Sequence, residues 1–211
     1  MEVFIGIDPS LNCSGISILK YFNNEKISEN FYCIKPNKLT KTELKEIENN
    51  INLDYILYNK NDLSIYKNMN FEYEYYKTQN IINIGKSIYN LIFENCDIYN
   101  DNIYIVMEGV SYGSAVKTSS INDLAGLNYI IRFMLQDKGN INLIISTPKQ
   151  IKKFATGNGN ANKDEIIFLF KNLFNINIKK IDDIADSYFM ARYAINIYNK
   201  DNNENIQWKE L

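Results

Sequence analysis

Three short apolar runs near the start of the chain constrain its fold most strongly. Residues 3–7, 15–22 and 29–34 are rich in β-branched and aromatic side chains, and turn-forming residues separate the runs. Three consecutive strands with tight connections predict an antiparallel meander. Asp8 and Pro9 end the first of these strands.

The rest of the chain alternates between helical and strand patterns. Apolar residues at helical spacing predict helices near residues 81–96, 120–137, 163–174 and 181–199, and buried-type strands at 103–107 and 141–146 lie between them. Pro148 can open a further short helix after the last strand. An antiparallel start followed by alternating helices and strands predicts an α/β fold, with a mixed five-stranded sheet flanked by helices.

Residues 35–77 do not follow this alternation. The stretch is rich in Lys, Glu, Asn and Tyr, has no sustained apolar stripe, and contains one candidate helix at 42–49. Because 211 residues allow one large domain, we interpret the chain as a single domain over 1–211 with a surface insertion at about 35–77.

The composition excludes several classes of site and location. The sequence has no histidine, which removes zinc–histidine sites and Ser-His-Asp triads. Three scattered cysteines predict a reducing compartment and no disulfide framework. No apolar run approaches the ~20 residues of a membrane span, and the N-terminus lacks a signal-peptide pattern. We therefore expect a cytoplasmic protein, in a bacterial cell or in the host cell of a virus.

The small net charge of −2 hides an asymmetry along the chain. Residues 1–110 carry 10 basic and 15 acidic side chains, whereas residues 111–180 carry 10 basic and 4 acidic ones. The basic segment is typical of a surface that binds phosphate, although a solvated mixed-charge surface fits the charges equally well. Its candidate nucleic-acid contacts are Tyr112, Lys117, Lys149, Lys152, Lys153 and Lys163.

Four acidic residues lie at the ends of predicted strands or on one face of a predicted helix. Asp8 and Glu108 each end a predicted strand, and Asp183 and Asp186 share one face of the last predicted helix. Aspartate is also common in the first turn of a helix, where it caps the helix and complements its dipole. For Asp183 and Asp186 taken by themselves, this explanation stays open. Four carboxylates without histidine suit a pair of Mg2+ ions, for which Mn2+ can substitute, and a phosphodiester substrate.

With these residues in place, the sequence resembles the RuvC family of Holliday-junction resolvases, within the RNase H-like superfamily. Ser10, where cellular members often have Gly, makes the pattern more similar to the phage and viral branch. The match covers most of the chain outside residues 35–77. Its motifs are Gly6-Ile7-Asp8-Pro9-Ser10 with Gly15, Met107-Glu108-Gly109, Thr147 to Lys153 through Gly157-Asn158-Gly159 to Lys163, and Asp183-Ile184-Ala185-Asp186.

The resemblance implies an RNase H-like fold and a metal-dependent endodeoxyribonuclease that cuts four-way DNA junctions. It implies metal ligation by Asp8, Glu108, Asp183 and Asp186, which are also the catalytic residues together with Lys163. Lys152 is implied near the scissile phosphate, with Lys153 as the alternate. In the family, an aromatic residue three positions after the strand-end glutamate wedges into the junction. This sequence has Ser111 at that position, with Tyr112 next to it, so its selectivity for junctions stays open.

Other interpretations remain at this point. A nuclease of the same fold can prefer flaps, other branches or RNA–DNA hybrids. An actin-like ATPase or sugar kinase also places Asp after its first strand, but the sequence lacks that class's second glycine-rich phosphate loop. A non-catalytic DNA-binding module has no need of four acidic residues near phosphate.

Two expectations concern assembly and movement. Symmetric cuts across a junction require two active sites, so we expect a homodimer. The helix at 120–137 carries the stripe Leu124, Leu127, Ile131 and Met134, which fits a dimer face or core packing within one chain. Because Lys163 follows a glycine-rich loop, we expect it to approach the phosphate only in the DNA complex and to lie far from the carboxylates without DNA.

Overall fold

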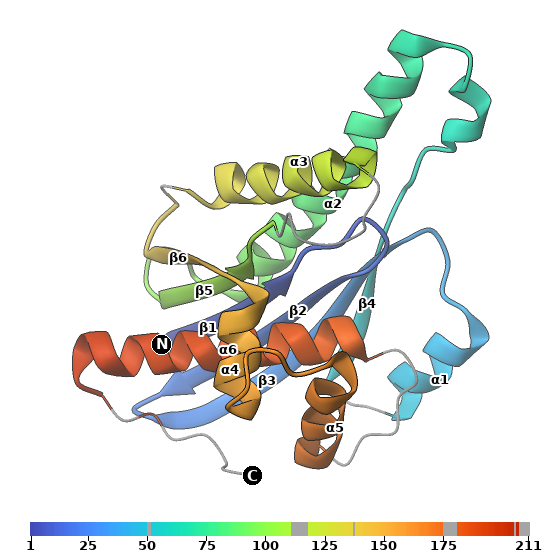
Figure 1. Cartoon of the computed structure of the whole chain (residues 1–211). Coiled ribbons are helices and arrows are strands. Elements are labelled where there is room, and N and C mark those ends of the chain that lie inside the picture. Colours follow the sequence, from blue (N-terminus) through green and yellow to red (C-terminus); the bar gives the residue numbers. More distant parts are fainter. Residues whose placement is uncertain (50–51, 111–117, 137, 175–180, 205, 207–211) are drawn as a thin grey trace.

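The computed structural model describes residues 1–49, 52–110, 118–136, 138–174, 181–204 and 206 (Figure 1). Its centre is one six-stranded mixed sheet in the order β4-β3-β2-β1-β5-β6. β1, β2 and β3 are antiparallel neighbours, whereas the β3–β4, β1–β5 and β5–β6 pairs are parallel. The strands are β1 (Glu2–Asp8), β2 (Ser14–Phe22), β3 (Glu25–Pro36), β4 (Leu53–Tyr58), β5 (Asn102–Glu108) and β6 (Ile141–Ser146).

Helices cover both faces of the sheet and create two hydrophobic cores. Alternation along β1 sends Phe4 into the core under α6 and sends Val3, Ile5 and Ile7 into the core under α2 and α3. The helices are α1 (Lys41–Asn49), the 3-10 turn η1 (Leu63–Tyr66), α2 (Asn70–Asn95), α3 (Thr118–Leu135), α4 (Pro148–Thr156), α5 (Lys163–Phe174) and α6 (Asp182–Asn202).

The predicted α/β class, with a mixed sheet between helices, is confirmed, but the sheet has one strand more than the five predicted. β4 lies inside the stretch interpreted as a surface insertion and pairs in parallel with β3. Leu53, Tyr55 and Tyr58 are buried there. The strand was missed because it is short and stands between polar segments. α2 also begins well before residue 81, and its first turns with η1 project from the body of the molecule (Figure 1).

The apolar stripe of α3 belongs largely to the core. Leu127 and Ile131 are fully buried against the sheet and α2, and Leu124 packs beside them. Core packing, one of the two explanations considered from the sequence, therefore accounts for this stripe. The outward face of α3 instead carries Tyr129 and Phe133, which are 63% and 80% exposed.

No helix in the described part of the chain combines the length and the apolar character needed to cross a bilayer.

Candidate active site

Asp8 and Glu108 lie side by side at one edge of the sheet. β1 and β5 are parallel neighbours whose register pairs Ile7 with Met107. Each strand ends one residue later, in a partly exposed carboxylate. The carboxyl ends of parallel strands are where an α/β sheet places its site, as the sequence predicted.

Two glycines bring α6 directly onto the sheet at this edge. A Cβ atom on Gly6 would lie 1.7 Å from the backbone oxygen of Ser187, and one on Gly15 would lie 2.0 Å from that of Asp183. The hydroxyl groups of Ser17 and Ser187 share a hydrogen bond of 2.8 Å across the same contact. Because Gly6 and Gly15 have no side chain and serine is small, the first turns of α6 hold their carboxylates beside the strand ends.

Asp183 and Asp186 therefore join Asp8 and Glu108, and the four carboxylates act on one another electrostatically. Burial, followed by the charges of Glu108, Asp186 and Asp183, raises the pKa of Asp8 well above its usual range. Burial and then the Asp186 charge raise the pKa of Glu108 to about 7. Burial and then Asp182 raise the pKa of Asp183 to about 6, and burial also raises that of Asp186. Such a cluster favours a cation.

Lys163 lies closer to these carboxylates than we expected. Its amino group stands 2.5 Å from Asp182 at the start of α6. Its charge also lowers the pKa values of Asp8, Glu108 and Asp186 relative to burial alone. The expectation of a distant Lys163 without DNA is wrong, because α5 begins at this residue and packs against α6.

α4 presents the other lysines predicted from the sequence. Thr147 and Gln150 form a capping box at its start, Pro148 occupies the first turn, and Gly157 ends it in the left-handed conformation with φ 78°. The charge of Lys152 acts on Glu108 and Asp186, so Lys152 faces the cluster. Lys149 and Lys153 are exposed. Tyr112 and Lys117 lie outside the described residues.

The donor set fits hard divalent cations. Aspartate and glutamate offer only oxygen, and the mutual repulsion just described falls when a cation binds. The carboxylates are spaced more widely than one tight ligand shell. Within the described residues, no three carboxylates have ligand atoms that all lie within 4.8 Å of one another. A wider spacing suits two ions better than one.

Cys13 and Cys33 form a disulfide beside Asp183, so the prediction of no disulfide is wrong for this pair. Cys33 stands opposite Gly15 in the β2–β3 register, which brings it next to the loop that carries Cys13. Cys96 is free and buried, and burial raises the pKa of its thiol to about 12. The two cysteines are 20 residues apart in the sequence, and no motif in the sequence indicated that they pair.

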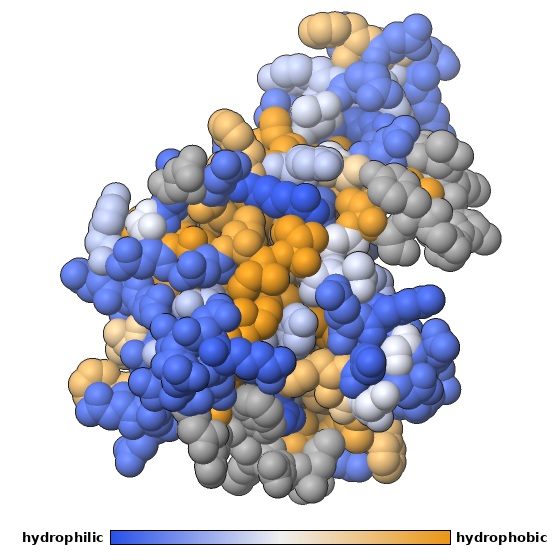
Figure 2. Space-filling model, turned by 60° about the vertical axis from the view of Figure 1, so that its left-hand side comes forward, coloured by the Kyte–Doolittle hydropathy of each residue, from blue (hydrophilic) through white to orange (hydrophobic). Residues whose placement is uncertain are grey.

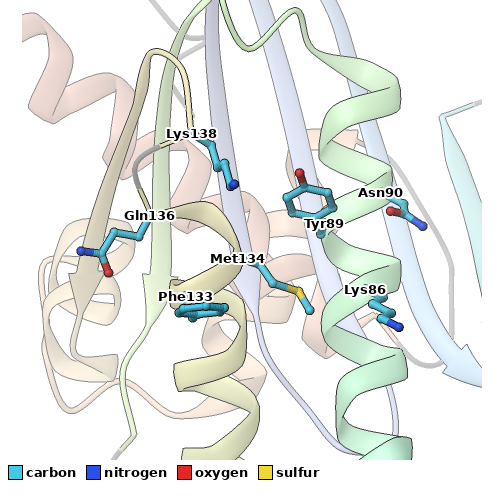
Figure 3. Close-up of a pocket in the computed structure, with 7 residues that line it drawn as sticks. All are labelled: Lys86, Tyr89, Asn90, Phe133, Met134, Gln136 and Lys138. Carbon is cyan, nitrogen blue, oxygen red and sulfur yellow. The ribbon is translucent and has the colours of Figure 1, made fainter.

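A cavity of about 770 Å3 lies between α2 and the end of α3 (Figure 3). Tyr89 from α2 and Met134 from α3 lie between the two helices, and Lys86 and Phe133 also line the cavity. The described residues that line it include no carboxylate. Its lining therefore offers no ligand set for the chemistry of the carboxylate cluster.

Comparisons with known proteins identify the family of this chain. The family model for crossover junction endodeoxyribonuclease RuvC matches residues 76–193, more than half of the chain. Glu108, Asp183 and Asp186 fall within that match, whereas Asp8 precedes it.

Individual relatives give the same result. The crossover junction endodeoxyribonuclease RuvC of Dictyoglomus thermophilum is 30% identical over 122 residues, covering 55% of this chain and 73% of the relative. That of Dictyoglomus turgidum is 30% identical over 109 residues, covering 49% and 66%.

Among solved structures, the Thermus thermophilus RuvC complex with a Holliday junction substrate aligns with a TM-score of 0.54 and 9% identity. The alignment covers 96% of this chain and 97% of that one, and it supports the fold. The chain belongs to the RuvC family of crossover junction endodeoxyribonucleases.

Proposed function

We propose that this chain resolves Holliday junctions with Asp8, Glu108, Asp183 and Asp186 as its metal ligands. RuvC-family nucleases are metal-dependent endodeoxyribonucleases, and this chain is one of them. The observation that carries the assignment of residues is the meeting of four carboxylates from β1, β5 and α6 at one sheet edge. An all-oxygen donor set favours Mg2+, with Mn2+ as a substitute.

The divalent ions, when bound, supply an activated water for attack and charge stabilisation for the leaving oxygen. The chain's own residues position the ions and the DNA strand. The four carboxylates would hold the ions at the end of the sheet. Lys163 exchanges its pairing with Asp182 for the scissile phosphate and neutralises the charge that develops there. Lys152, whose charge acts on Glu108 and Asp186, holds the same strand.

Branched DNA is the proposed substrate. The Thermus RuvC structure holds a Holliday junction, and we carry that substrate over to this chain. The basic segment 111–180 contributes α4 and the start of α5 beside the carboxylates, where Lys149, Lys152, Lys153 and Lys163 can neutralise phosphates. Tyr112 and Lys117 remain proposed contacts of the same kind.

A homodimer would give the junction its two symmetric cuts. We propose the α2–α3 surface of Figure 3 for the contact, because Phe133 is 80% exposed beside an open cavity. We also propose one domain over 1–211, with residues 35–77 as an addition that lends β4 to the sheet, and action in the cytoplasm.

Cleavage of matched synthetic substrates tests the function. A four-way junction, a flap, an RNA–DNA hybrid and plain duplex are incubated with Mg2+ or with EDTA. We expect paired cuts in the junction with Mg2+ only. Equal or faster cutting of the flap or hybrid would reassign the selectivity, and activity in EDTA would overturn the metal-dependent site.

A further inference from the structure

Two sulfur ligands lie beside the carboxylate cluster. Figure 2 shows hydrophilic side chains over much of one face of the molecule, and in a chain without histidine such a surface offers a cation mainly oxygen. The chain has three cysteines, and two of them, Cys13 and Cys33, lie next to Asp183. One ligand atom of each of these three residues lies within 4.8 Å of the other two. We call these three residues the sulfur site.

Three separate segments bring the sulfur site together. Cys33 is buried on β3, where it stands opposite Gly15 of β2. Asp183 belongs to the first turn of α6, whose backbone approaches Gly15 so closely that a Cβ there would lie 2.0 Å from the Asp183 oxygen. Strand register and helix contact therefore fix Cys33 and Asp183. Cys13 is half-buried in the loop between β1 and β2, so a small ion can reach it from solvent.

The sulfur site can hold an ion only after the disulfide between Cys13 and Cys33 is opened. Reduction adds two electrons and two protons and leaves two thiols. In a cell, two small thiols supply both and end as their own disulfide. The proposed cytoplasmic location is reducing, and cysteines in such a compartment are more often metal-binding or catalytic than bridged.

The reduced pair fits a tetrahedral ion. With Zn–S bonds of about 2.3 Å, two sulfur ligands of a tetrahedral ion lie about 3.8 Å apart, so the two sulfurs must move away from each other. The Cα atoms of Cys13 and Cys33 are 6.1 Å apart. Rotation of the Cys13 side chain in its loop can provide the movement while Cys33 stays in the strand. An oxygen of Asp183 gives the third ligand, and water can occupy the fourth position.

The ligand type selects the class of ion. Thiolates are soft ligands that favour Zn2+ and similar ions, whereas Mg2+ prefers oxygen. Mg2+ is therefore expected at the carboxylates and not at the sulfurs. Asp183 belongs to both groups, because its carboxylate interacts electrostatically with Asp186 and also lies beside the two sulfurs. An ion held by the sulfurs would compete for this residue.

We infer that reduced Cys13 and Cys33 bind one soft divalent ion such as Zn2+ together with Asp183, and that this ion inhibits cleavage by removing Asp183 from the Mg2+ site. Binding releases the two thiol protons to solvent, and the disulfide form is closed to the ion. The binding is independent of what the enzyme cuts, whereas the inhibition rests on the proposed function.

Cd2+ titration tests the binding, because cadmium–thiolate bonds add ultraviolet charge-transfer absorption and cadmium–oxygen bonds do not. The protein is reduced with a phosphine, which takes the oxygen of one water while the two hydrogens go to the sulfurs. The phosphine is removed under nitrogen, and the reduced and oxidised proteins are titrated side by side. We expect one Cd2+ per reduced chain, displaced by Zn2+, and no such band for the oxidised chain. Equal bands in both forms, or none in the reduced form, would overturn the inference.

Single substitutions assign the ligands. Cys13→Ser and Asp183→Asn should each weaken Cd2+ binding more than about tenfold, the loss that removing even an outer partner of a metal brings. Cys96→Ala, at the free buried cysteine, and Asp201→Asn, at an exposed aspartate of α6, are the matched controls and should bind as the wild type does. Unchanged binding by Cys13→Ser would overturn the inference. The comparison of reduced and oxidised wild type decides the question even where a variant does not fold.

Junction cleavage tests the inhibition. In excess Mg2+, one equivalent of Zn2+ should slow single-turnover cleavage by the reduced wild type at least about tenfold. The oxidised wild type and reduced Cys13→Ser should cut at the same rate with and without Zn2+. Full cleavage by the reduced wild type with the ion bound would overturn the shared role of Asp183. If the wild type cuts no junction at all, that result rejects the proposed function, and the Cd2+ titration still decides the binding.

Discussion

Replacing Glu108 with glutamine should stabilise the metal-free protein, and more so at alkaline pH. Burial and the neighbouring Asp186 charge raise the pKa of Glu108 from 4.5 to about 7. The folded protein therefore holds the Glu108 proton more tightly than the unfolded chain does. The stability that the bound Glu108 proton adds to the folded state is fully present below a pH of about 4.5 and is lost as the pH rises through about 7.

The size of the pKa shift of Glu108 determines how much the free energy of unfolding changes. At 1.36 kcal/mol per pKa unit, ionised Glu108 costs the folded state about 3 kcal/mol above pH 7. At pH 5 the unfolded chain is only partly ionised, so the cost is about 1 kcal/mol. Glutamine carries no charge at either pH. The stability gained by Glu108→Gln should thus be larger at pH 8 than at pH 5 by roughly 2–3 kcal/mol.

Urea unfolding in EDTA, followed by circular dichroism at the two pH values, measures this difference. Any change in packing that glutamine brings is the same at both pH values and cancels. Glu94→Gln, at an exposed glutamate of α2, is the control and should leave the pH dependence as in the wild type. A gain for Glu108→Gln that is equal at both pH values would refute the reasoning. Added Mg2+ should stabilise the wild type and have much less effect on Glu108→Gln.

Two further predictions concern Lys163 and Gly6. Lys163→Ala should slow single-turnover cleavage by about 10²–10³ with little effect on junction binding, and a wild-type rate at saturating enzyme would remove its catalytic role. Gly6→Ala should lower the free energy of unfolding by at least about 1–3 kcal/mol, since its Cβ meets the Ser187 backbone at 1.7 Å. Gly126→Ala, in α3 with no atom within 4 Å of the added Cβ, should be neutral or stabilising in the same urea titration.

The sequence predicted which carboxylates lie at this sheet edge because the signals for their positions are local. Asp8 and Glu108 end strands whose apolar character is plain, and Asp183 and Asp186 follow helical spacing. Parallel pairing of β1 and β5 then brings distant residues together without further information. Gly6 and Gly15 stood in the family motif, but only the structure gives them a physical role, as the contact surface for α6.

What the sequence missed depends on contacts between distant segments. β4 is a short edge strand in a polar region, and its pairing with β3 defines it more than its own pattern does. The disulfide between Cys13 and Cys33 follows from strand register. The cavity lined by Gly109, Tyr129 and Arg132 is assembled from segments far apart in the sequence, so Tyr129 and Arg132 carry no local signal.

Cleavage and binding of a four-way junction by Asp186→Asn, measured on one preparation, decide whether the carboxylate cluster is the nuclease site. We expect Mg2+-dependent cleavage to be lost and junction affinity to be kept, because affinity depends on the basic segment rather than on Asp186. Asp201→Asn, an exposed aspartate on the same helix, should cut as the wild type does. Full cleavage by Asp186→Asn would remove Asp186 from the ligand set and contradict the proposed active site.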